Sequence, residues 1–279
     1  MMLSRRILRG SRLANMLGVI IGIVFMLPLI WLLFTAIAPA HFMGQYPPSL
    51  WPRAVTAENF IDAFRGYNFQ EYLAGSLIVT LISTILVVGL GSPAAYALAR
   101  THMRGKLPIL LALLLVSTFP AMAVMMPLYV IFRQFGQLNT YQCLIIPYVA
   151  LNLPFAIWLL RTYYHEVPFE IEEAGRIDGA SPMIIVTRLI LPQVIPGTCV
   201  AGVLTFVACW QEFLLSLSFN TQPGHQTIPV GIAGMTSYSG VPFPTVFSAS
   251  LIALVPVIVM VVVIRKWMVQ GAFQGGVKG

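Results

Sequence analysis

Six long stretches of the sequence contain no Asp, Glu, Lys or Arg, and this spacing restricts the fold more than any other feature. They cover residues 13–52, 72–99, 107–132, 134–160, 189–211 and 213–264. A helix needs about 20 apolar residues to cross the hydrocarbon core of a bilayer. Because 58% of the 279 residues are hydrophobic and only 9% are charged, too few polar groups remain to cover a globule in water. The sequence therefore predicts an all-α polytopic membrane protein with six transmembrane helices, near 14–38, 74–97, 108–131, 139–160, 196–219 and 245–264.

The basic residues predict how these helices are oriented. Thirteen of the 16 Lys and Arg residues lie at the two termini or in the second and fourth connections between helices. The other three, Arg53, Arg65 and Arg133, lie on the opposite side. By the positive-inside rule, both termini and the acidic segment around residue 172 are cytoplasmic. Since the basic clusters flank apolar spans, they argue against a nucleic-acid partner despite the net charge of +7.

Three regions follow from this pattern. Residues 1–71 hold a basic segment, the first helix and an outer loop, residues 72–266 form the transmembrane core, and residues 267–279 form a cytoplasmic tail. A cleaved signal peptide is the alternative for the first span, because Ala36-Ile37-Ala38 resembles a cleavage site. The apolar run is longer than the roughly 7–15 residues of a signal peptide, so we expect it to remain as a membrane helix.

Neither a metal site nor a catalytic constellation is apparent in the sequence. The cysteines lie inside apolar runs without metal-ligand spacing, and the histidines fall in different connections on both sides of the membrane. We therefore expect a chain that is not an enzyme, with Cys143, Cys199 and Cys209 as small core residues.

A short acidic segment separates the fourth and fifth predicted helices. Pro168 can open a helix whose first turn is rich in Glu, and Gly179 suits a left-handed C-terminal stop. Ser181-Pro182 then reads as the N-cap and first turn of a second helix. Helices that lie on lipid usually carry Lys and Arg, whereas Glu166–Asp178 contains five acids and one Arg. The pattern therefore favours a rigid bend that docks on a soluble partner.

This segment resembles the EAA motif of type I ABC importer permeases. In that motif Glu-Ala-Ala is followed by three residues, Gly, nine residues and Ile-x-Leu-Pro. The chain has the same spacing, with Gly175 in place of the second Ala and Leu189 in place of Ile. Four further stretches resemble the smaller, six-helix member of the maltose-type carbohydrate permease pair: Ile177–Ser181, Trp210–Phe213, Ile228–Gly231 and Gly275–Gly279.

The resemblance implies a non-catalytic permease subunit in a bacterial or archaeal inner membrane. It would form half of a translocation pore with a second, homologous permease, bind two cytoplasmic ATP-binding subunits and receive a sugar from an extracytoplasmic solute-binding protein. ATP and Mg would be bound by the partner ATPase. The absence of a GxxxxGK[ST] phosphate loop and of any cofactor motif from this sequence agrees with that division of labour.

The resemblance also implies which residues meet the partners. The Gly275–Gly279 tail would reach the ATPase pair. The Thr221–Phe243 loop would meet the binding protein, the alternative being an untethered polar connection. The residues implied in coupling to the ATPase, within residues 168–192, are Glu172, Glu173, Ala174, Gly175, Asp178, Gly179, Leu191 and Pro192.

Glu212 has two interpretations. A carboxylate at the bilayer centre costs about 2.5–3.5 kcal/mol on insertion scales, so such groups face the interior of a helix bundle. In one interpretation Trp210, Gln211 and Glu212 line the path of the sugar. In the other, Glu212 lies near the outer interface and pairs with Arg133 or water.

A stand-alone secondary transporter or channel is the alternative function. It predicts inverted internal repeats and several ionisable residues inside the membrane. No clear repeat is present, and Glu212 is the only candidate acid within the apolar runs.

Overall fold

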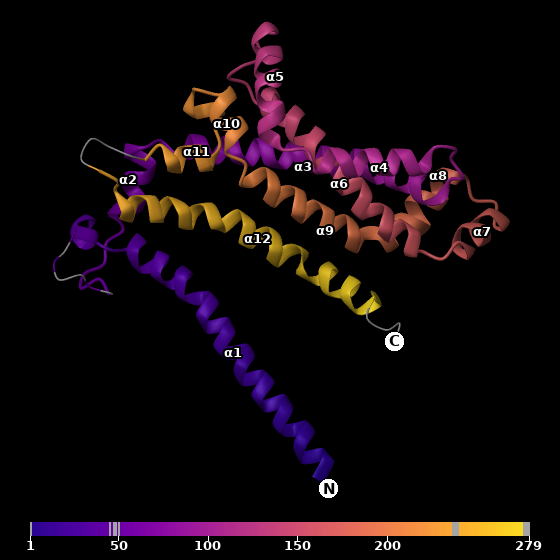
Figure 1. Cartoon of the computed structure of the whole chain (residues 1–279), viewed down its shortest axis with the longest axis horizontal. Coiled ribbons are helices and arrows are strands. Elements are labelled where there is room, and N and C mark those ends of the chain that lie inside the picture. Colours follow the sequence, from indigo (N-terminus) through magenta and orange to yellow (C-terminus); the bar gives the residue numbers. More distant parts are fainter. Residues whose placement is uncertain (1, 45, 47–48, 50, 236–239, 276–279) are drawn as a thin grey trace. The chain divides into compact units, whose positions relative to one another are not determined.

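The structure is a computed structural model that describes residues 2–44, 46, 49, 51–235 and 240–275. Within these residues the chain forms twelve α-helices with short 3-10 and π-helical segments (Figure 1). They divide into two compact units, one made of Met1–Asn68 with Gly234–Leu254 and the other of Phe69–Ala233 with Val255–Gly279.

Three long helices make the core of the second unit: α3 (Phe69–Arg100), α6 (Gln142–Glu166) and α9 (Leu191–Trp210). All three pack against one another, and α4 (Lys106–Ser117) packs on α6. In lipid, close packing of small side chains replaces much of the hydrophobic drive between helices. Accordingly, the buried residues of α3 are, apart from Phe69 and Leu98, small or β-branched: Gly75, Ser76, Val79, Thr80, Ser83, Val87, Gly91 and Ala95.

The single helix predicted over 108–131 is wrong, because the structure breaks it. α4 ends at Ser117, α5 (Ala121–Gln134) begins after Pro120, and the two helices bend by 88°. Pro120 has no N–H to donate and disfavours a helical conformation at Phe119. The bent pair is therefore one interrupted segment.

The helix predicted over 196–219 is also wrong at both ends. Helical structure already begins at Pro182, because a π-helical segment, Ile185–Ile190, runs directly into α9. Pro192, at this junction, has no backbone N–H to donate. α9 ends at Trp210, and a separate short helix, α10 (Leu214–Phe219), follows after a turn. The remaining short elements of this part are η3 (Pro223–His225) and α11 (Ile228–Ala233).

The first unit contains α1 (Met2–Ala36), η1 (Ala40–Gly44), α2 (Glu58–Gly66) and the start of α12 (Phe243–Gly275). The buried Asn59 ties it together, donating from Nδ2 to the carbonyls of Ala36 at 2.8 Å and Ala38 at 2.7 Å. From α12, the Ser248 hydroxyl donates to the same Ala36 carbonyl at 2.9 Å. These bonds satisfy carbonyls that the end of α1 leaves without helical partners.

α12 continues well beyond the predicted helix 245–264, so residues 267–275 of the predicted tail are helical. The last four residues of that tail, 276–279, lie outside the described residues. Within the described part, five helices are long and apolar enough to cross a membrane, and the bent pair makes a sixth candidate. The predicted all-α polytopic class is confirmed.

The tight packing of α9 on α6 gives a test of the core. A Cβ added at Gly197 would overlap the ring of Tyr163, whereas a Cβ at the exposed Gly89 of α3 would meet nothing within 4 Å. We expect Gly197→Ala to lower the free energy of unfolding by about 1–3 kcal/mol, the usual cost of overpacking. Gly89→Ala is the matched control, and thermal unfolding in detergent is the measurement. Equal stability of the two variants would contradict this packing.

Candidate functional site

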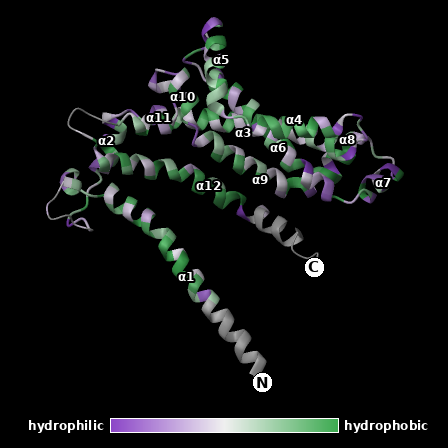
Figure 2. Ribbon diagram, viewed as in Figure 1, coloured by the Kyte–Doolittle hydropathy of each residue, from purple (hydrophilic) through white to green (hydrophobic). Residues whose placement is uncertain are grey.

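The acidic segment forms a bent structure at one end of the second unit (Figure 1), and we call residues 168–192 the elbow. It contains α7 (Glu170–Ile177), α8 (Pro182–Ile184) and a π-helical stretch, η2 (Ile185–Ile190), that runs into α9. Figure 2 shows hydrophilic residues gathered around α7 and hydrophobic ones along α3, α6 and α9. The predicted order of short helix, bend and second helix is confirmed.

Gly179 makes the bend. Its φ of 76° is left-handed, and its N–H donates to the Arg176 carbonyl at 3.1 Å while the Ala180 N–H donates to the Gly175 carbonyl at 2.9 Å. These two bonds form a Schellman stop. Ser181 then caps α8 by accepting from the Ile184 N–H at 3.4 Å. Since a Cβ at Gly179 would meet no atom within 4 Å, glycine is required there for its backbone conformation and not for space.

A buried ion pair fixes one side of α7. Glu172 is 1% exposed, and its Oε1 lies 3.1 Å from Nε of Arg100, the last residue of α3. Arg176, one turn along α7, lies 3.7 Å from the other carboxylate oxygen but is itself 63% exposed. Carboxylates are almost never buried unless they are paired, so Arg100 accounts for the burial of Glu172.

Gly175 lies on the same buried side of α7. A Cβ built there would be 2.8 Å from Cδ1 of Leu189 and 3.1 Å from Cγ1 of Ile185. The two departures from the EAA pattern, Gly175 and Leu189, thus face each other. The missing methyl group leaves room for Leu189, which branches at Cγ and carries two δ-methyl groups where isoleucine carries one, so we interpret the two departures as compensating.

An apolar cluster extends from the buried side of α7 into the core of the helix bundle. It joins the elbow to the ends of α3, α6 and α9. The elbow is therefore packed against the bundle through side chains and is not attached to it only through its two ends. Its buried members are Ala95, Leu98, Ile157, Leu160, Tyr164, Val167, Ile185, Ile190, Val194 and Ala201.

The opposite side of the elbow is open to solvent. Ile177, an apolar side chain, is 85% exposed, and Met183 is 72% exposed. Of the residues predicted to couple to the ATPase, Glu173, Ala174, Asp178, Gly179 and Pro192 are exposed, and Leu191 is half-buried. Glu172 and Gly175 are buried within the chain, so their side chains hold the elbow in place instead of forming its free surface.

Sequence reasoning counted Arg100 only as one positive charge among those on the cytoplasmic side. In the structure one guanidinium contacts three points of the elbow and its entry: the Val167 carbonyl, the Phe169 ring at 6.0 Å from its centroid, and Glu172. The available signal was an Arg at the end of a predicted span, on the same side of the membrane as an acidic segment.

Glu212 lies in the turn between α9 and α10. Its carboxylate accepts from the Tyr148 hydroxyl at 2.6 Å and from the backbone amides of Leu215 at 2.8 Å and Ser216 at 3.3 Å. It therefore caps the start of α10, and these groups, not Arg133, are its partners among the described residues. Tyr148 was missed by the sequence analysis.

The two other residues of the predicted sugar path, Trp210 and Gln211, lie in different surroundings. Trp210 is 7% exposed and stacks on Phe206 with ring centroids 5.4 Å apart, while Gln211 is exposed. The structure therefore does not bring Trp210, Gln211 and Glu212 together on one open surface.

The predicted outer loop, Thr221–Phe243, is anchored over much of its length. The Ile228 N–H donates to the buried Ser76 hydroxyl at 2.7 Å, and the Tyr141 hydroxyl donates to the Gly224 carbonyl at 2.8 Å. A Cβ at Gly231 would come within 2.5 Å of the Tyr72 ring. The alternative of an untethered connection is therefore wrong for residues 221–233, while 236–239 lie outside the described residues.

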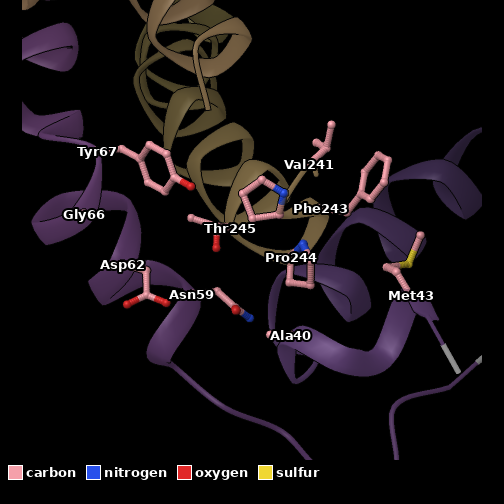
Figure 3. Close-up of a pocket in the computed structure, with 11 residues that line it drawn as sticks. Ala40, Met43, Asn59, Asp62, Gly66, Tyr67, Val241, Phe243, Pro244 and Thr245 are labelled. Atoms are coloured by element: carbon pink, nitrogen blue, oxygen red, sulfur yellow. The ribbon is translucent and has the colours of Figure 1, made fainter. Parts of the chain in front are cut away.

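The first unit holds a cavity of about 280 Å³ (Figure 3). It is bounded by η1, α2 and the start of α12, and it mixes aromatic, carboxylate, amide and hydroxyl groups. Its lining residues are Ala40, Met43, Asn59, Asp62, Gly66, Tyr67, Val241, Pro242, Phe243, Pro244 and Thr245. The last part of the predicted outer loop thus forms one wall.

Comparison with known proteins identifies the class. Residues 88–272 match the family described as "Binding-protein-dependent transport system inner membrane component". The chain is 36% identical over 252 residues to the sulfoquinovosyl glycerol transport system permease protein SmoH of Agrobacterium fabrum, covering 90% of this chain and 88% of that one. It is 34% identical over 275 residues to the trehalose transport system permease protein SugB of Mycobacterium tuberculosis, covering 97% and 100%.

A solved structure has the same fold. The crystal structure of a bacterial ABC transporter involved in the import of alginate includes a chain that aligns with a TM-score of 0.78 and 19% identity, covering 93% of this chain and 96% of that one.

The chain therefore belongs to the family of binding-protein-dependent inner-membrane transport components. It is a multi-pass ABC transporter permease subunit that works with a binding protein and ATPases, and it is not an enzyme. Because the family acts through these partners, the alternative of a stand-alone secondary transporter is not supported.

The contact between Gly175 and Leu189 predicts a coupled pair of mutations. Gly175→Ala gains up to about 1 kcal/mol of helix propensity but incurs about 1–3 kcal/mol of overpacking, so we expect a net loss of stability. Leu189→Val removes the δ-carbons and should relieve that loss, with a coupling free energy of at least about 0.5 kcal/mol. Unfolding of the single and double variants measures it. Strict additivity would show that the two residues do not contact each other.

The Glu212 cap predicts a loss of stability and not only of sugar affinity. Glu212→Ala leaves two amides and the Tyr148 hydroxyl without their acceptor, which should cost about 1–3 kcal/mol of unfolding free energy. Tyr148→Phe, which keeps the cap, should cost less. Both are measured by thermal unfolding in detergent. An unchanged stability with a raised KM for uptake would instead assign Glu212 to the sugar path.

Proposed function

We propose that this chain is the six-helix permease of an ATP-driven importer for a sugar or oligosaccharide, paired in the membrane with a second, homologous permease. The relatives named above are permease proteins for sulfoquinovosyl glycerol and trehalose, and identity extends over nearly the whole chain in both. Both solutes are glycosides, which supports a glycoside as the substrate class.

The two-sided elbow is the observation that carries the coupling role. One side is bound inside the chain through Glu172 and Gly175, and the other presents an exposed apolar residue, Ile177, beside the carboxylates of Glu173 and Asp178. Met183 and Ile184 of the elbow are also exposed, and several exposed apolar side chains with charges nearby favour a protein docking surface more than a single one would. The ATP-binding subunit is the occupant that the EAA spacing supports, and two such subunits would serve the permease pair.

The positive-inside rule supports a cytoplasmic position for the elbow and both termini. The anchored outer loop and the cavity beside Asp62 and Phe243 would then face outward, where the solute-binding protein delivers the sugar. ATP-driven closure of the ATPases would displace the elbows and turn the pore outward, and hydrolysis would reset it. The pore is thus a two-state equilibrium that its partners bias.

Uptake into proteoliposomes tests the function. We expect the chain, reconstituted with its second permease, ATPases and binding protein, to import trehalose or sulfoquinovosyl glycerol. Import should occur only when ATP is present in the compartment that the ATPase subunits face. Uptake by the chain alone, driven by a proton or sodium gradient, would overturn the proposal.

A variant of the free elbow surface tests the docking. Ile177→Glu places a charge in the proposed interface and should weaken binding of the ATPase subunit by about 2 kcal/mol, roughly 30-fold, as expected for a central contact. Val55→Glu is the matched control, because Val55 is a 72% exposed apolar residue in the opposite, outer loop. Co-purification and titration of the ATPase measure the effect. Equal binding to both variants would exclude this surface as the dock.

A further inference from the structure

We propose that Arg100 is a positioning residue for energy coupling: through its ion pair with Glu172 it fixes the elbow to the end of α3, so that a displacement of α7 moves α3. The inference rests on the proposed function and adds the route by which a displacement of the elbow by the ATPase passes to the helix bundle. Neither residue need touch the ATPase or the sugar for this role.

The guanidinium of Arg100 contacts the end of α6, the entry to the elbow and α7. It donates to the Val167 carbonyl, where the chain leaves α6, lies against the Phe169 ring and pairs with Glu172 on α7. The planar fork of Arg presents several donors in a fixed geometry, so these contacts set both the distance and the angle between α3 and the elbow.

Burial separates this pair from an ordinary surface ion pair. The side chains of Arg100 and Glu172 are 9% and 2% exposed. Exposed pairs rearrange easily and are screened by solvent, whereas a pair held in a poorly solvated site keeps one geometry. Arg176 gives the internal comparison, because it contacts the same carboxylate but is exposed and belongs to α7 itself.

Two side chains of α3 interact with Glu172, the guanidinium of Arg100 and the hydroxyl of Tyr96, and only Arg100 supplies a charge. The apolar contacts between the elbow and the bundle are non-directional, so α7 can slide on them. Arg100 adds a hydrogen bond to the Val167 carbonyl and an ion pair with Glu172, in which Nε and Oε1 lie 3.1 Å apart without hydrogen-bond geometry. Separating two buried opposite charges is costly, so the ion pair opposes such sliding. α3 in turn packs along both α6 and α9, so a movement of its end reaches helices that line the core of this unit.

Stability alone does not explain why charges occupy this position. Replacing a buried ion pair with apolar residues of similar size often leaves stability unchanged or higher. Removing one partner alone, by contrast, leaves an uncompensated buried charge. A comparison of single and double replacements therefore distinguishes a contact that transmits movement from one that only stabilises the fold.

The experiment uses the complete transporter in proteoliposomes, with Arg100→Met, Glu172→Met, the double variant, Arg100→Lys and Arg176→Gln. The measured quantities are the yield of assembled complex, the ratio of binding-protein-stimulated to basal ATP hydrolysis, and sugar imported per ATP, with trehalose and sulfoquinovosyl glycerol as probes. Arg176→Gln is the matched control, because it removes a cation from the same carboxylate without cutting the link to α3.

We expect each Met single variant to reduce the yield of complex and the double variant to recover it. The stimulation ratio and the sugar imported per ATP of the double variant should stay about five- to tenfold below wild type, within the usual range of coupling between sites. Arg100→Lys, which keeps the charge but not the fork, should fall between. Arg176→Gln should remain within about twofold of wild type, as for a surface pair.

Three results would overturn the inference: a double variant coupled as tightly as wild type, a double variant that does not assemble, or an equal loss in Arg176→Gln. Failure of the proposed function looks different, because the wild-type complex would then show neither ATP-dependent uptake nor stimulation by the binding protein.

Discussion

A buried ion pair at the end of α3 decides which side of the elbow is free. With Glu172 paired to Arg100 and Gly175 pressed on Leu189, one face of α7 is committed to the chain's own helices. The helix has eight residues, so committing one face leaves Glu173, Ala174 and Ile177 on the other. The left-handed turn at Gly179 then turns the chain into α8, which leads through η2 into α9. An exposed, oriented surface follows from these few contacts.

The bundle beneath the elbow shows how lipid as a solvent shapes packing. Because lipid tails are as apolar as leucine, helices associate mainly by close approach. Gly197 lies against the Tyr163 ring and Gly91 faces Leu153 and Ile157, so at these contacts a large side chain of α6 packs directly against a glycine of α9 or α3. Some polar groups inside the bundle are paired, as in the Ser92–Tyr164 bond of 2.6 Å, whereas the hydroxyls of Thr80, Ser83 and Thr84 on α3 have no hydrogen-bond partner among the described residues. A tightly packed bundle of this kind transmits displacement, because it has little free space to absorb it.

Local signals in the sequence were enough for much of this fold. Charge-free runs predicted the long helices, and Gly179, Ser181 and Pro182 predicted the bend, since caps and turns depend on neighbouring residues. Contacts between residues far apart in sequence were not accessible in this way. The burial of Glu172 depends on Arg100, and the cap on α10 depends on Tyr148, each on a different helix. The same limit explains why the break at Pro120 and the end of α9 at Trp210 were missed: a proline or a carboxylate permits a break, but packing decides whether it forms.

Chemical cross-linking from the free face of the elbow tests the account most directly. In a variant whose native cysteines are replaced by Ala, Ala174→Cys should cross-link to an ATP-binding subunit in the assembled transporter, and the efficiency should change when ATP replaces ADP. The same cysteine should resist an impermeant thiol reagent added outside intact cells. Labelling from outside, or no cross-link in a complex that imports sugar, would contradict the claim that this surface receives the push from ATP.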